Sequence, residues 1–114
     1  FSVAVLNINN IRDIDTDKQA GKNTVPVRLG LDRARKYHWL LLLIGFLLAI
    51  LFVLLDYSSI FQLLFIFTFP LFIRNGRGVS RATGPALNRY LGQMSLTTFL
   101  FVLTFGLGII LAPN

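Results

Sequence analysis

The sequence has 114 residues, of which 54% are hydrophobic and 14% are charged, and its formal net charge is +6. About a quarter of the residues of a typical soluble domain are charged, so this composition indicates a membrane protein. The lack of cysteine excludes disulfides and thiolate metal sites. The basic residues do not indicate nucleic-acid binding, because no aromatic platform is interleaved with them.

The first segment of the chain is apolar and short. Phe1 to Ile8 cannot cross a bilayer alone and predicts the end of a spanning helix that begins before Phe1. We therefore expect residues 1–114 to be a fragment of a longer protein. The helix is expected to continue to about Ala20 and to stop at Gly21, which adopts positive φ easily. Lys22 to Gly30, with Pro26 between two valines, predicts an extended loop.

Three longer apolar segments follow. A helix is expected from Leu31, and its uncharged run Trp39 to Leu55 is long enough to cross when its flanks are counted. The run Ile60 to Ile73 is short for a span, and Pro70 is expected to kink it. The last span is expected at Leu91 to Ala112. The pattern predicts an all-α fold, a multi-pass transmembrane helix bundle with about three full spans and the end of a fourth.

The basic residues are confined to two segments. Seven of the eleven lie between Arg12 and Lys36, and the other four are Arg74, Arg77, Arg81 and Arg89. We expect a second polar loop at Arg74 to Pro85. The turn at Asp56 to Ser59 and the end at Pro113 to Asn114 carry no basic residue. The positive-inside rule therefore predicts that both basic segments face the cytoplasm, which we expect to be the cytoplasmic side of a bacterial inner membrane.

The acidic run between these apolar segments is the strongest candidate site. Asp13 and Asp17 are four residues apart, so on a helix they share a face, whereas Asp15 points away. Two carboxylates at this spacing fit Mg²⁺, which is usually shared between one or two carboxylates and substrate phosphates. The nearby bases, predicted to contact a diphosphate, are Arg12, Lys22 and Arg28.

The acidic run has two other interpretations. A solvated loop whose charges only set membrane topology remains open, as it would be in a transporter or scaffold without enzymatic activity. A calcium-binding EF-hand is disfavoured, because Lys18 occupies the position that needs glycine and Thr24 the position that needs glutamate.

Three arginines and one histidine carry weaker signals. Arg74, Arg77 and Arg81 either anchor the topology or contact lipid headgroups or a diphosphate. His38, next to Trp39, is expected at the membrane interface rather than in catalysis.

The acidic run is part of a longer motif that resembles a known family. The string Asn9-Asn10-Ile11-Arg12-Asp13-x-x-x-Asp17-x-x-Ala20-Gly21-Lys22-x-Thr24-x-x-Val27-Arg28-Leu29-Gly30 resembles the second aspartate-rich motif of the UbiA superfamily of intramembrane prenyltransferases. It is most similar to the branch that acts on 1,4-dihydroxy-2-naphthoate in menaquinone biosynthesis. The later stretch Gly84-Pro85-Ala86-Leu87-Asn88 is similar to the same branch more weakly.

The resemblance implies that residues 1–114 are the C-terminal part of a single integral-membrane prenyltransferase domain. It implies a bundle of nine transmembrane helices with two aspartate-rich motifs that hold Mg²⁺ against a polyprenyl diphosphate. It implies prenyl transfer to the naphthoate with loss of its carboxyl group. Asp13 and Asp17 would be catalytic metal ligands, Arg12 and Lys22 would contact the diphosphate, and Asn9 and Asn10 would orient an aspartate or face the acceptor.

The sequence departs from the family in one respect, since the first aspartate-rich motif is missing. We therefore expect the 114 residues to be inactive without the remaining N-terminal helices of the same enzyme. A related enzyme acting on another aromatic acid, such as 4-hydroxybenzoate, is the alternative that keeps the chemistry.

Overall fold

Helices make up all the regular secondary structure in the computed structural model, which describes residues 1–57 and 60–111. In chain order they are α1 (Ser2–Arg12), α2 (Ile14–Gln19), α3 (Val25–Leu29), α4 (Leu31–Leu55), the 3₁₀ helix η1 (Ile60–Thr68), α5 (Phe69–Val79), the 3₁₀ helix η2 (Gly84–Ala86) and α6 (Leu87–Leu111). The all-α prediction is confirmed. Ser58 and Ser59 of the expected turn, and the expected end at Pro113–Asn114, lie outside the described residues.

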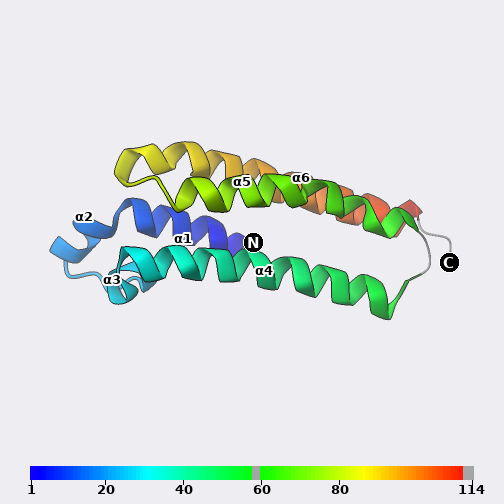
Figure 1. Ribbon diagram of the computed structural model, residues 1–114, viewed down its shortest axis with the longest axis horizontal. Helices are drawn as coiled ribbons and strands as arrows, with labels where there is room; N and C mark the ends of the chain where they lie inside the picture. Colours follow the sequence, from blue (N-terminus) through cyan, green and yellow to red (C-terminus); the bar gives the residue numbers. More distant parts are fainter. Residues whose placement is uncertain (58–59, 112–114) are drawn as a thin grey trace.

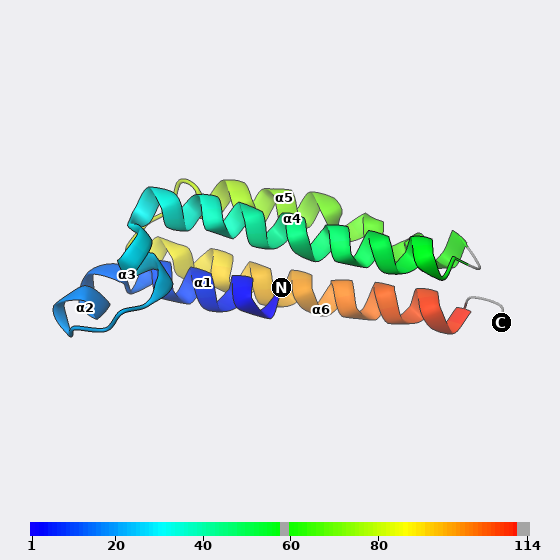
Figure 2. The ribbon, with the colours of Figure 1, turned by 90° about the horizontal axis from the view of Figure 1, so that it is seen from below.

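The helices run side by side in an elongated bundle of 54 × 23 × 19 Å (Figure 1). From α4 the chain returns through η1 and α5 and then runs back along α6. Helix α1 packs against α4 and α6, and the N-terminus lies near the middle of the bundle (Figure 2). The segment from α1 to α4 and the α5–α6 connection lie at the same end. The two basic segments therefore share one end of the molecule, as their pattern predicts; we term it the basic end.

Phenylalanine rings fill the middle of the bundle. Phe46, Phe65 and Phe72 come from α4, η1 and α5, and all three are buried. Phe1 stacks on Phe72 with ring centroids 4.3 Å apart, and Phe101 of α6 meets Phe65 edge-on at 5.7 Å. Aromatic pairs of this kind add about 0.5–1.5 kcal/mol each beyond the burial of their area. The ring cluster thus packs α4, η1, α5 and α6 against one another in the middle of the bundle.

A chain of polar side chains, two buried and one half-buried, connects α4, α5 and α6. His38 Nε2 lies 2.8 Å from Asn75 Oδ1, and Asn75 Nδ2 donates to Gln93 Oε1 at 2.7 Å. Gln93 Nε2 donates in turn to the carbonyl of Leu71 at 3.1 Å. Because polar groups in an apolar bundle are costly to leave unpaired, these bonds favour a single register of the three helices. His38 is buried between these helices, so its side chain serves the packing of the bundle.

The expected loop from Arg74 to Pro85 is wrong in its first half, because α5 continues to Val79. Gly76 and Gly78 are contact positions in a helix rather than turn residues. A Cβ on Gly76 would lie 2.5 Å from the ring of Trp39, and one on Gly78 would lie 1.9 Å from the ring of Tyr90. Small residues that permit such close approach are typical of helix packing in membranes.

The expected extended loop at Lys22–Gly30 is also wrong in part, because it contains α3. The hydroxyl of Thr24 caps this helix by accepting a hydrogen bond from the backbone N–H of Val27 at 3.4 Å. Pro26 lies in the first turn, where its missing N–H costs no intrahelical bond. Gly30, with φ of 83°, separates α3 from α4.

Two helical segments, Leu31–Leu55 and Gly84–Leu111, are long and apolar enough to cross a membrane. The expected span at Ile60–Ile73 is divided between η1 and α5, and Pro70 lies in the first turn of α5. Proline is tolerated there, so the expected kink takes the form of a change from 3₁₀ to α geometry. Many large apolar side chains on α4 and α6 remain exposed, which suits contact with lipid or with further helices.

We expect Gly78→Ala to destabilise the protein by about 1–3 kcal/mol, because the added Cβ overlaps the ring of Tyr90. The measurement is the melting temperature in detergent. Gly92→Ala is the matched control on α6, since a Cβ there would meet nothing within 4 Å. Equal melting temperatures for the two variants would contradict the close packing of α5 on α6.

Candidate functional site

Asp13 lies at the break between α1 and α2. Its backbone, with φ of −98° and ψ of 17°, closes the first helix and opens the second. The carbonyl oxygen of Asp13 accepts the N–H of Asp17 at 2.8 Å and the hydroxyl of Thr16 at 3.1 Å. Asp13 and Asp17 are therefore one helical turn apart at the basic end, as their spacing predicts.

Arg12 holds the carboxylate of Asp13 with two nitrogens. Nε donates to Oδ1 and Nη2 donates to Oδ2, each at 3.1 Å. Nη2 also donates to Oδ1 of Asn9, and Nη1 donates to Oδ1 of Asn88 at 2.8 Å. All three guanidinium nitrogens thus have acceptors within the protein, and Arg12 connects the acidic motif to the first turn of α6.

The hydrogen bonds from Arg12 lower the pKa of the Asp13 carboxyl below its ordinary value of 3.8. Partial desolvation opposes this shift, while the positive charges of Arg12 and Lys22 add to it. Asp13 is consequently ionised at neutral pH. Its side chain is still 38% exposed, so the carboxylate remains accessible to a cation.

Asp17 has its own basic neighbour. The chain turns back at Gly21, whose φ is 75°, and the backbone N–H of Lys22 donates to the carbonyl of Asp17 at 2.9 Å. Lys22 Nζ then lies 3.9 Å from Oδ1 of Asp17. The predicted helix stop at Gly21 is confirmed. The lysine side chain is 68% exposed, which leaves its ammonium group open to an anion from solution.

The other predicted residues lie outside this set of contacts. Arg28 is exposed on α3 and Asn10 is half-buried on α1, and in the part of the chain that the structure describes neither bonds to Asp13 or Asp17. Asp15 lines a hollow of ≈310 Å³ together with Lys18, on another side of Arg12, and is exposed. The structure therefore brings together Asn9, Arg12, Asp13, Asp17 and Lys22, and leaves Asn10 and Arg28 at its margin.

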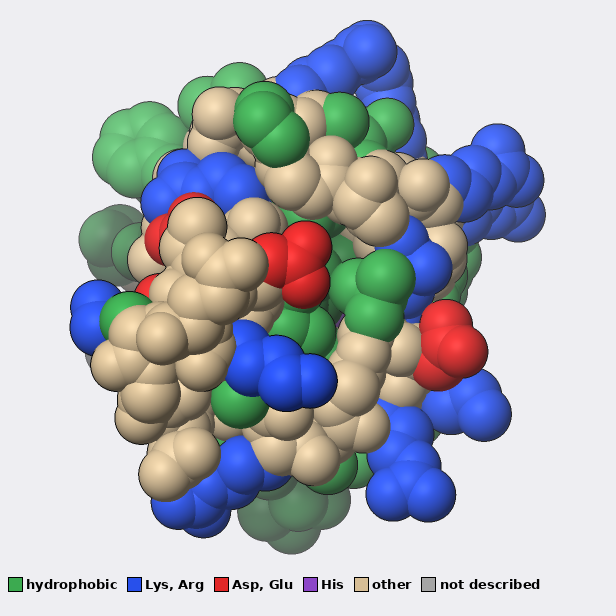
Figure 3. All heavy atoms as spheres, turned by 90° about the vertical axis from the view of Figure 1, so that its left-hand side faces the viewer, with side chains coloured by type: hydrophobic (Ala, Val, Ile, Leu, Met, Phe, Trp, Pro, Cys, Tyr) green, Lys and Arg blue, Asp and Glu red, His purple; other side chains and the backbone are tan. Residues whose placement is uncertain are grey.

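An open hollow of ≈380 Å³ lies over Arg12 and Asp13 and is walled by Thr16, Pro85 and Asn88. Figure 3 shows this end of the molecule, where carboxylates lie among a larger number of Lys and Arg side chains. Such a surface attracts anionic ligands through its overall charge, while the carboxylates supply oxygen ligands for a cation.

A complete metal site is not formed by these residues alone. Among residues 1–57 and 60–111, no three His, Cys, Asp or Glu side chains gather closely enough to hold an ion. Asp13 and Asp17 nevertheless fit Mg²⁺, because this ion needs only one or two protein carboxylates when substrate phosphates complete its shell. The arrangement fits a metal ion shared with a phosphorylated ligand and with groups from elsewhere.

Sequence reasoning missed Asn88 as a site residue. It is 76 positions from Arg12, to which it offers its side-chain oxygen. The available signal was the stretch Gly84–Asn88, whose resemblance to the family had no assigned role. In the structure η2 positions this stretch beside α1, so that Asn88 opens α6 next to the acidic motif.

Comparisons with known proteins give relatives of one kind. The chain is 43% identical over 108 residues to the 1,4-dihydroxy-2-naphthoate octaprenyltransferase of Escherichia coli (strain K12). This alignment covers 90% of this chain and 35% of that protein. It is 39% identical over 109 residues to the enzyme of the same name from Haemophilus influenzae, and this alignment covers 95% of this chain and 35% of that protein. No solved structure matches.

The chain thus spans about a third of the length of the curated relatives it matches. Residues 1–97 match the UbiA prenyltransferase family, and this region contains the whole acidic motif together with Asn88. On this evidence the chain belongs to the UbiA prenyltransferase family.

Proposed function

We propose that the protein transfers a prenyl chain from a polyprenyl diphosphate to 1,4-dihydroxy-2-naphthoate, with loss of the acceptor's carboxyl group, in menaquinone biosynthesis. The observation that carries the proposal is the 39–43% identity to two naphthoate octaprenyltransferases over nearly the whole chain. The paired carboxylates and neighbouring bases support it, because they suit a metal-bound diphosphate.

Prenyltransferases of this family generally depend on a divalent metal. In our proposal Asp13 and Asp17 hold Mg²⁺, which would neutralise the negative charge that grows on the departing diphosphate. Lys22 and Arg28 contact the diphosphate directly, since both side chains are exposed at this end.

Arg12 has a different place in the proposed site. Its donors already serve Asp13, Asn9 and Asn88, so it aligns the Asp13 carboxylate and adds positive charge beside the diphosphate. Asn9 helps to fix the guanidinium. Asn10, which has no bond to either aspartate, is assigned to the acceptor side.

The proposed site needs carboxylates that these 114 residues do not contain. Three of the five acidic residues belong to the acidic motif, and the other two are Asp32 and Asp56, at opposite ends of α4. We therefore propose that the first aspartate-rich motif comes from other helices of the same enzyme, and that residues 1–114 alone are inactive.

We propose that the site faces the cytoplasm from a bacterial inner membrane. The support is that both basic segments lie at the same end of the bundle as the acidic motif (Figure 1).

Replacing Asp13 or Asp17 by asparagine is expected to reduce magnesium-dependent prenyl transfer by about 100-fold or more, because the metal loses an anionic ligand. The assay uses the enzyme in its native membrane, with 1,4-dihydroxy-2-naphthoate and 4-hydroxybenzoate in competition. Asp32→Asn, which removes an exposed carboxylate from the start of α4, is the control. Full activity of both site variants would refute the metal role, and preference for 4-hydroxybenzoate would refute the acceptor.

Arg12→Gln is expected to raise the pKa of Asp13 toward 3.8, because the hydrogen bonds that depress it are lost. In the native protein the Arg12–Asp13 contact stabilises the fold above pH 3.8 and is lost as the pH falls through the depressed folded-state pKa. The measurement is a ¹³Cγ titration of Asp13, assigned with Asp13→Asn. Arg33→Gln should leave the titration unchanged, and an unshifted Asp13 in Arg12→Gln would contradict the geometry.

The proposed orientation is testable by cysteine labelling, because the 114 residues contain no cysteine and any cysteine elsewhere in the enzyme can first be replaced by serine. Lys18→Cys at the basic end should react with a membrane-impermeant maleimide only when the cytoplasmic face is open, as in inverted vesicles. Tyr57→Cys, at the opposite end of α4, should react from the outside of intact cells after outer-membrane permeabilisation. The reverse pattern would reject the orientation.

A further inference from the structure

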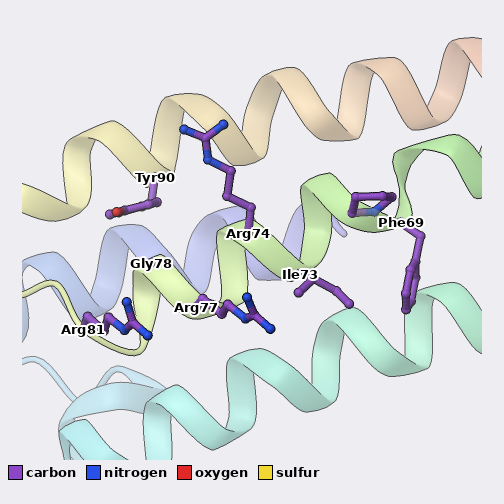
Figure 4. A pocket seen from close by; sticks show the side chains of 8 residues that line it. Phe69, Ile73, Arg74, Arg77, Gly78, Arg81 and Tyr90 are labelled. Atoms are coloured by element: carbon purple, nitrogen blue, oxygen red, sulfur yellow. The ribbon is translucent and has the colours of Figure 1, made fainter.

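A third hollow toward the basic end has no part in the proposed reaction. It has a volume of ≈550 Å³ and lies along α5, with Tyr90 of α6 at its edge (Figure 4). Its lining includes Arg74, Arg77 and Arg81, and it ends in apolar residues at Phe69 and Ile73. We call it the arginine groove. None of these residues belongs to the Arg12–Asp13 cluster.

The charge in this groove is not used by the fold. Arg74, Arg77 and Arg81 are exposed, and in the described ranges 1–57 and 60–111 none of their side chains makes a hydrogen bond or ion pair. Arg35 shows the contrast, because its guanidinium donates to the carbonyls of Val79 at 3.1 Å and Ala82 at 2.8 Å. One arginine thus secures the end of α5, while three others are left for an external anion.

No acidic side chain lines the groove. In Figure 4, Arg74 extends toward α6, whereas Arg77 and Arg81 extend to the other side of α5, so guanidinium groups flank the hollow above Gly78. The ring of Tyr90 packs directly against the backbone of Gly78, because Gly78 has no side chain. Planar guanidinium groups in such an arrangement suit phosphate oxygens.

The groove changes character along its length. Arg81 lies just past the end of α5 and Arg77 in its last turn, whereas Phe69 and Pro70 lie in its first turn, about two turns from Arg77 toward the middle of the bundle. In a chain with membrane-spanning helices, this direction runs from the headgroup region into the hydrocarbon. A ligand that matches it has a phosphate at one end and an apolar chain at the other.

We infer that the arginine groove binds an anionic phospholipid, with its phosphate between Arg77 and Arg81 and an acyl chain along Ile73 and Phe69. This inference does not depend on the proposed prenyl transfer. Polyprenyl diphosphate shares the same chemistry, a phosphate on an apolar chain, and the experiment must therefore separate the two ligands.

Trp39 offers a local probe, since it is the one tryptophan of the sequence and lines an apolar hollow of ≈160 Å³ together with Phe69 and Ile73. A brominated acyl chain in the groove would quench its fluorescence by contact. The protein is placed in nanodiscs containing one mixture of phosphatidylglycerol and phosphatidylcholine, with bromine on either lipid. Because the lipid mixture is the same in both measurements, the overall surface charge is also the same. Trp39→Phe defines the background emission.

The expected result is stronger quenching by brominated phosphatidylglycerol, with an enrichment of roughly fivefold for each arginine engaged. Arg77→Gln/Arg81→Gln should abolish the preference, and Arg77→Lys/Arg81→Lys should retain part of it. The matched control is Arg33→Gln/Lys36→Gln, which removes two exposed charges from α4 and should keep the preference. Helical content by circular dichroism checks folding, and the two single glutamine variants replace the double variant if it unfolds.

Three results would overturn the inference. Equal quenching by the two lipids would show no selective site. Equal loss of preference in the groove variant and the α4 control would show only general surface attraction. Displacement of the brominated lipid by polyprenyl diphosphate, but not by unbrominated phosphatidylglycerol, would assign the groove to the prenyl substrate.

Discussion

The guanidinium of Arg12 joins the acidic motif to the start of α6, and no other side-chain hydrogen bond links these two segments among residues 1–57 and 60–111. It holds Asp13 with two nitrogens, is itself held by Asn9, and reaches Asn88 at the start of α6. The acidic motif is therefore attached to a helix that begins more than seventy residues later. Because charge-assisted hydrogen bonds are directional, this one side chain sets where the carboxylate points relative to the bundle.

Behind this end, the bundle is held in register by features suited to an apolar surrounding. Burial of apolar area does little to choose between helix registers when lipid is as apolar as the helices. The His38–Asn75–Gln93 bonds and the close contacts at Gly76 and Gly78 supply that choice. The position of α6, and hence of Asn88, depends on them. The His38–Asn75–Gln93 bonds thus align the helices, and the bonds of Arg12 align the acidic motif.

Sequence patterns predicted the helices well where the apolar runs were long, as in α4 and α6, and where a single residue had one conformational role, as at Gly21. They failed at Arg74–Val79 and Val25–Leu29, where glycine and proline were taken as signs of loops. Both residues have a second use that depends on neighbours: glycine admits an aromatic ring from another helix, and proline opens a capped helix. Neither use is visible in local sequence.

The sequence by itself determined the all-α class, the gathering of basic residues at one end, and the one-turn spacing of Asp13 and Asp17. These follow from apolar run length and helical periodicity, which are local properties. Only the tertiary structure decided that Arg12 is occupied within the protein, that Asn88 lies beside the acidic motif, and that His38 is buried. The reason is that each depends on a contact between helices distant in sequence, and its formation is governed by how the whole bundle packs.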